Sequence, residues 1–111
     1  MMRMNAAWQF IVVPDGVTDV EAEAEAIMDS LVDLNQVDDR LSSAAVGLDL
    51  DAMTLDIEVT VTAADYEDCV NHALVAIRTA IHSAGGATPG WPGPAAGHAS
   101  FQPHDFRAVP A

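Results

Sequence analysis

Carboxylates dominate the side chains that could do chemistry. The sequence has 17 Asp and Glu residues against four Arg and no Lys. In the stretch MTLDIEVTVT, Asp56 and Glu58 alternate with apolar residues, so they point to one side of a predicted strand, roughly 7 Å apart. With Asp49 or Asp51 on a neighbouring strand they could form a carboxylate pair for acid–base chemistry. A solvated sheet face explains the same pattern.

A second set of acids follows one side of a predicted helix, in VEAEAEAIMDSLVDL. These acids are spaced four residues apart: Glu21, Glu25, Asp29 and Asp33. Like charges at this spacing cost ~0.2–0.5 kcal/mol per pair, and the helix dipole stabilises acids in the first turn by ~0.3–1 kcal/mol each. The stripe is therefore tolerated without a ligand, although the dipole disfavours Asp29 and Asp33. A weak cation site near Asp38 is the alternative, but residues 33–44 lack the ligands of an EF-hand loop.

The remaining reactive residues match no known arrangement. Cys69 is expected to be a buried small residue of the second helix. His98, His104 and Asp105 do not have the spacing of a standard metal motif. Two further histidines, His72 and His82, are separated by roughly 80° around a helix axis, so we expect both to be exposed. We therefore assign no catalytic residue, metal ligand or cofactor.

Trp91 is the most suggestive single residue of the C-terminal third. It stands in GGATPGWPGPAAG, a Gly/Pro-rich loop over residues 85–97. A loop of this length is typical of either a mobile or a functional segment. Trp91 is expected either to fold back over the core of the protein or to contact a ligand or partner.

The charge balance excludes several classes of partner. The formal net charge is −13, whereas nucleic acids and anionic membranes are bound by basic patches. No apolar run is long enough to cross a membrane. The single cysteine cannot form an intrachain disulfide, which indicates a reducing, cytoplasmic setting.

Hydrophobic periodicity predicts one α+β domain over residues 1–111, with its core in residues 5–84. A strand apolar on both faces, residues 6–13, is expected at the centre of the sheet. A helix capped by Thr18 follows, then a hairpin over residues 41–62. A second helix extends from the Thr62–Asp65 capping pattern to Gly85.

The last predicted element is an edge strand over residues 98–109, in which Pro103 excludes a central position. The resulting order, β-α-β-β-α and a final strand, predicts a ferredoxin-like βαββα(β) sandwich. Its antiparallel sheet carries two helices on one face and leaves the other face open.

One segment adds a resemblance. The stretch AIRTAIHSAGGATPGWPGP, and TPGWP within it above all, resembles small uncharacterised actinobacterial proteins with a ferredoxin-like fold. The likeness extends over most of the chain. It implies that fold and a cytoplasmic setting, and it brings no activity with it.

Three classes of function are compatible with these patterns. The first is a binding or assembly module that uses the open sheet face, with Trp8 and Phe10 as an apolar centre, to form a homodimer or to bind a partner or ligand. The second is an acidic DNA mimic that inhibits a basic protein through Asp29, Asp33, Asp56 and Glu58. A small carboxylate enzyme is the third, and the sequence favours a protein that is not an enzyme.

Overall fold

Six elements follow one another along the chain in the order β-α-β-β-α-β. They are β1 (Met2–Val13), α1 (Val20–Val37), β2 (Leu41–Asp49), β3 (Thr54–Ala63), α2 (Tyr66–Ser83) and β4 (Ser100–Pro110). This computed structural model describes residues 1–16, 19–90 and 98–111. The strands form one antiparallel sheet in the order β2-β3-β1-β4. The predicted ferredoxin-like α+β fold is confirmed.

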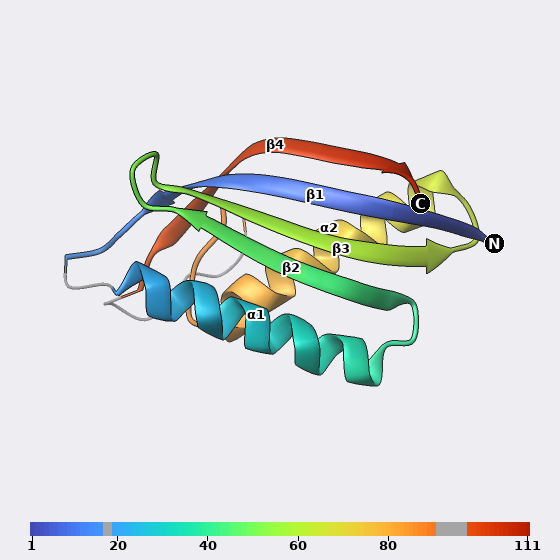
Figure 1. The fold of residues 1–111 in the computed structure, drawn as a ribbon, viewed down its shortest axis with the longest axis horizontal. Coiled ribbons are helices and arrows are strands. Elements are labelled where there is room, and N and C mark those ends of the chain that lie inside the picture. Colours follow the sequence, from blue (N-terminus) through green and yellow to red (C-terminus); the bar gives the residue numbers. More distant parts are fainter. Residues whose placement is uncertain (17–18, 91–97) are drawn as a thin grey trace.

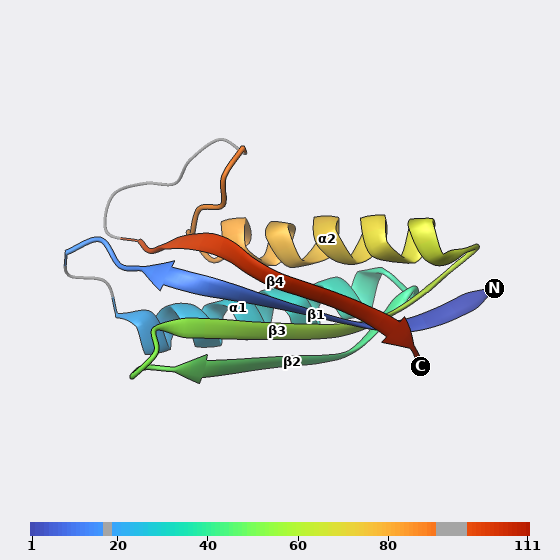
Figure 2. The ribbon, with the colours of Figure 1, turned by 90° about the horizontal axis from the view of Figure 1, so that it is seen from above.

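Both helices pack along the same face of the sheet (Figures 1 and 2). Alternate residues of β3 point toward them and are almost completely buried: Leu55, Ile57, Val59 and Val61. From α1, Ile27 and Leu31 enter the same core, as their helical spacing predicts. Among the described residues, no helix or second sheet covers the opposite face. Asp56 and Glu58 are therefore exposed there, whereas Thr60 is 6% exposed.

The face of β1 that meets the helices is the one that carries its aromatic residues. Trp8 is 8% exposed and Phe10 is 0% exposed, and their rings pack with centroids 4.6 Å apart. Trp8 also meets Phe106 of β4 edge to face. The prediction that Trp8 and Phe10 form an apolar centre on the open face is therefore wrong. The reason is that residues 6–13, the predicted span of the strand, are mostly apolar on both sides and do not reveal which side the helices cover.

The two edges of the sheet differ in how they are protected. β4 carries Pro103 and charged residues, and its pairing with β1 shifts register between Gln9 and Phe10. β2 has no charged residue from Leu41 to Leu48, and its one irregularity is the register shift at Ser43, where φ is 52°. Because charges, proline and bulges discourage pairing with another chain, β2 is the less protected edge.

The helix ends differ slightly from the predicted ones. Thr18 lies outside the described residues, and the side chain that caps α1 is Asp19, which accepts a hydrogen bond from the Ala22 backbone N–H. Asp65 caps α2 in the same way, so that helix begins at Tyr66. Gly85 follows the last turn of α2 with φ 97°, the left-handed conformation that glycine adopts without strain.

Candidate binding site

The centre of the open sheet face is built from side chains that the strand register places in rows. Ala7 of β1 lies opposite Glu58 of β3 on one side and opposite Arg107 of β4 on the other. Directly opposed residues of antiparallel strands point to the same face. A small side chain therefore lies between a carboxylate and a guanidinium.

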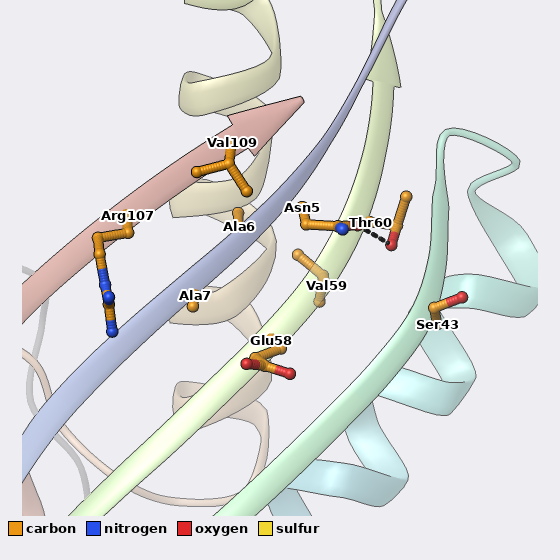
Figure 3. Close-up of a pocket in the computed structure, with 9 residues that line it drawn as sticks. All are labelled: Asn5, Ala6, Ala7, Ser43, Glu58, Val59, Thr60, Arg107 and Val109. Carbon is orange, nitrogen blue, oxygen red and sulfur yellow. Dashed lines mark hydrogen bonds between the residues drawn. The ribbon is translucent and has the colours of Figure 1, made fainter. Parts of the chain in front are cut away.

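This small side chain leaves a hollow of about 500 Å³ in the middle of the face. We call it the central hollow, and Figure 3 shows the residues around it: Asn5, Ala6, Ala7, Ser43, Glu58, Val59, Thr60, Arg107 and Val109. A second hollow, of about 90 Å³, adjoins it along the strands. Its lining shares Ala7 and Arg107 with the first, so the two hollows are neighbours on the face.

The charged side chains around the central hollow have weak ion pairs or none among the described residues. Arg107 Nε lies 3.7 Å from Asp105 Oδ2, and these side chains are 78% and 57% exposed, so solvent screens the pair. Within the described part of the chain, neither Asp56 nor Glu58 has a hydrogen bond or ion pair. The predicted placement of Asp56 and Glu58 on one exposed side of a strand is confirmed.

The floor beside these charges is held in place by one polar contact. Thr60 Oγ1 donates a hydrogen bond of 2.8 Å to Asn5 Oδ1 across the β1–β3 pair (Figure 3). This bond fixes the orientation of the Asn5 amide and leaves its NH₂ group available at the central hollow. The hollow thus offers two kinds of donor, an amide and a guanidinium, beside a carboxylate.

The acidic stripe of α1 lies on the opposite side of the molecule. Asp29 and Asp33 are exposed on the helix surface, away from the sheet. Across residues 1–16, 19–90 and 98–111, no three His, Cys, Asp or Glu side chains come close enough together to hold a metal ion. The structure therefore brings no ligand set together around this stripe.

Asp38, at the C-terminal end of α1, has partners that the sequence did not reveal. Its Oδ2 lies 2.6 Å from His72 Nε2 of α2, and its Oδ1 accepts hydrogen bonds from the backbone N–H and the Nε of Arg40. Burial alone would raise the pKa of Asp38, but the hydrogen bonds from Arg40 and His72 outweigh it and lower the pKa below its usual value. His72, expected to be exposed, is instead part of this cluster, with 20% of its side chain exposed.

Glu23 is a buried acid that the sequence analysis did not single out. Its carboxylate accepts the backbone N–H of Ala99 through both oxygens and lies 2.8 Å from His98 Nδ1. These contacts join the first turns of α1 to the start of β4. His98 therefore has a structural partner, whereas His104, on β4, is exposed. The two histidines do not form a common site.

His82 is likewise held in a network. Its Nε2 lies 2.8 Å from Thr88 Oγ1 and accepts the Thr88 backbone N–H, while Arg78 Nε donates to the same Oγ1. Burial, together with the positive charge of Arg78, lowers the pKa of His82 below its ordinary value. The expectation that His82 would be exposed is therefore wrong. The residue anchors the segment that follows α2.

Two other predicted residues have contrasting outcomes. Cys69 is 1% exposed, and its thiol lies near the backbone carbonyls of Met2 and Val61, which confirms that it is a buried core residue. Trp91 lies outside the described residues, so its prediction is not tested. No helix in the described ranges is both long and apolar enough to span a membrane.

Comparisons with known proteins identify no relative. No family model, no curated protein and no solved structure matches this chain. The resemblance to small actinobacterial proteins is therefore supported in its fold alone.

Proposed function

We propose that the protein is a binding module without catalytic activity, and that its open sheet face takes up a small polar ligand at the central hollow. The observation that supports this best is the row Arg107–Ala7–Glu58, in which opposite charges flank a side chain of one methyl group. A volume of about 500 Å³ falls in the range of small-molecule sites.

A homodimer through the same face is the main alternative. Of the large apolar side chains that remain exposed on this face, Ile11 and Val13 lie toward one end, and Val109 lines the central hollow. The centre of the face also carries Asp56 and Glu58, and a second copy would bring further carboxylates against them. Burying charges without partners is costly, so this arrangement favours a ligand over a second copy.

The structure offers less support for a DNA mimic. Such a protein would present its carboxylates to one basic groove. Here the stripe with Asp29 and Asp33 lies on the helix side of the molecule, whereas Asp56 and Glu58 lie on the open sheet face. One groove cannot contact both sets. A carboxylate enzyme is supported least, because Asp56 and Glu58 have no organised partner among the described residues.

The proposal is tested by filling the central hollow. Ala7→Leu adds bulk to its floor, whereas Ala45→Leu places the same side chain in the same cross-strand row, on β2 and outside the lining. We would titrate both variants and the unmodified protein with amino acids, diamines, dicarboxylates, sugar phosphates and nucleotides, and follow backbone amide shifts by NMR. We expect at least one compound to shift open-face amides of the unmodified protein and of Ala45→Leu, but not of Ala7→Leu.

Two results would contradict the proposal. One is that no compound of the panel shifts the open-face amides. The other is a concentration-dependent dimer in sedimentation experiments that Ala7→Leu dissociates, because the face would then belong to a second copy.

A further inference from the structure

The charges in and beside the central hollow are unequal in number. Two rows cross the face at this point, and both are set by strand register: Arg107–Ala7–Glu58 and Asp105–Gln9–Asp56. Together they contain three carboxylates and one guanidinium. A ligand that binds here therefore meets more negative than positive charge on the protein, and an excess of positive charge on the ligand favours binding.

From this arrangement we infer that the ligand is a basic amino acid, a compound with one carboxylate and two cationic groups. The inference rests on the proposed function, because it assigns the chemistry of the ligand at that same site. The ligand carboxylate pairs with Arg107, and its distal cationic group lies against Glu58 and Asp56.

Arg107 is suited to receive a carboxylate. Its guanidinium is exposed, and its neighbour Asp105 lies at 3.7 Å in a solvent-screened pair, so a ligand carboxylate can compete for it. A guanidinium binds a carboxylate through two parallel hydrogen bonds, which fixes orientation as well as charge. The Asn5 amide, which Thr60 holds on the β3 side of β1, is a further donor at the central hollow.

The central hollow has two walls, one at Arg107 on β4 and the other at Glu58 and Asp56 on β3. The second wall is suited to a cation. Glu58 and Asp56 project from β3 on the same face, and neither has a hydrogen bond or ion pair in the described part of the molecule. The formal net charge of −13 also attracts cations to the protein and repels anions. A dicarboxylate therefore meets repulsion from Glu58 and Asp56 that Arg107 alone does not balance.

The spacing of the walls favours an elongated ligand. Arg107 and Glu58 lie on strands that flank β1, so their Cα atoms are roughly 10 Å apart, twice the spacing of neighbouring strands. A basic amino acid places its distal cation several bonds from its carboxylate and can extend from one wall toward the other over Ala7. A simple amino acid without a basic side chain cannot reach both walls equally well.

The test compares three ligands of similar length by isothermal titration calorimetry. They are L-lysine, pentane-1,5-diamine and pentanedioate, which differ in whether they carry both kinds of charge or one. We expect saturable binding of L-lysine, weaker binding of the diamine and no binding of pentanedioate. Losing one charged hydrogen bond should weaken binding about tenfold or more.

Two substitutions assign the roles of the walls. Arg107→Gln should remove the advantage of L-lysine over the diamine, because only L-lysine has a carboxylate. Glu58→Gln should weaken the binding of both. Arg3→Gln is the matched control, since Arg3 is an exposed arginine of β1 that does not line the central hollow. It should leave all three affinities unchanged.

The outcomes separate this inference from the proposed function. If pentanedioate binds as well as L-lysine, or Arg107→Gln leaves the preference for L-lysine intact, the assignment of the walls is wrong. If L-lysine does not bind but another compound gives shifts that Ala7→Leu abolishes, the ligand class is wrong and the binding module stands. If no compound binds, both are wrong.

Discussion

Glu23 and His98 are 75 positions apart in the chain, yet His98 Nδ1 lies 2.8 Å from Glu23 Oε1. The same carboxylate accepts the backbone N–H of Ala99, which is buried. Glu23 thus connects the beginning of α1 with the beginning of β4. A buried N–H that loses its acceptor keeps the full cost of its desolvation.

Glu23→Ala is therefore expected to destabilise the fold by ~1–3 kcal/mol, because it leaves the Ala99 N–H without an acceptor. The measurement is the free energy of unfolding from urea denaturation. Glu25→Ala, at an exposed position of the same helix, is the control and should change it little. Equal effects of the two substitutions would show that Glu23 makes no net contribution.

A second prediction compares the two sides of α1. Leu31 is 0% exposed, so Leu31→Ala should cost ~2–5 kcal/mol through lost packing and the cavity left behind. Asp29 belongs to the exposed like-charge stripe, and Asp29→Ala should be neutral or slightly stabilising. The free energy of unfolding of both variants is measured by urea denaturation. A loss above about 1 kcal/mol for Asp29→Ala would mean that this acid has a partner beyond those described.

Two glycines provide a matched pair for packing. A Cβ added to Gly86 would lie 2.6 Å from Phe101 and 2.9 Å from Ile81, so Gly86→Ala should cost ~1–3 kcal/mol by overpacking. A Cβ added to Gly47 would meet nothing within 4 Å. Gly47→Ala should therefore stabilise the folded protein by ~0.4–1 kcal/mol, because alanine gives the unfolded chain fewer conformations than glycine does. Thermal unfolding should show shifts of opposite sign. Two shifts of the same sign would refute this account.

The pH dependence of stability should show the contribution of His82. Its pKa is lowered in the folded state, so as pH falls below about 6.5 the unfolded chain binds a proton first and stability decreases. The decrease continues until pH reaches the lower, folded pKa. His82→Gln removes this group, and its free energy of unfolding should therefore vary less between pH 7 and pH 5. Parallel curves for the two proteins would exclude this contribution.

Salt should act on the acidic stripe by screening alone. Sodium chloride is expected to raise the melting temperature, and magnesium chloride at matched ionic strength should do so to a similar extent. A divalent cation held by Asp29 and Asp33 would behave differently, because its stabilisation would saturate with concentration. Saturation that disappears in the Asp29→Asn, Asp33→Asn double variant would establish such a site.

The buried face was predicted correctly for elements with one apolar face, but not for β1. In β3, Leu55 and Ile57 alternate with polar residues, so sequence alone identifies the strand and its buried side. Residues 6–13 of β1 are mostly apolar on both sides, and they do not reveal that Phe10 is buried while Ile11 is 44% exposed. The full strand carries a signal, because its exposed side also holds Arg3, Asn5 and Gln9. The order of elements nevertheless sufficed to predict the sheet.

The candidate site was predictable only in part, because the pairing of strands distant in the sequence brings its charged residues together. The alternation in β3 placed Glu58 on an exposed face. Arg107 lies in a segment with weak alternation, and its position beside Ala7 depends on the register shift between β1 and β4. The partners of Asp38 and Glu23 likewise come from distant segments, for which local patterns carry no signal.

The uncharged edge of β2 has a consequence for the colloidal behaviour of the protein. Near neutral pH, repulsion between molecules of formal net charge −13 keeps these edges apart. Close to the isoelectric point of about 4.1 that repulsion vanishes, and the backbone groups of Leu41–Leu48 are free to pair between molecules. Precipitation in mild acid would then begin by sheet extension at β2, and a lysine placed on that strand would delay it.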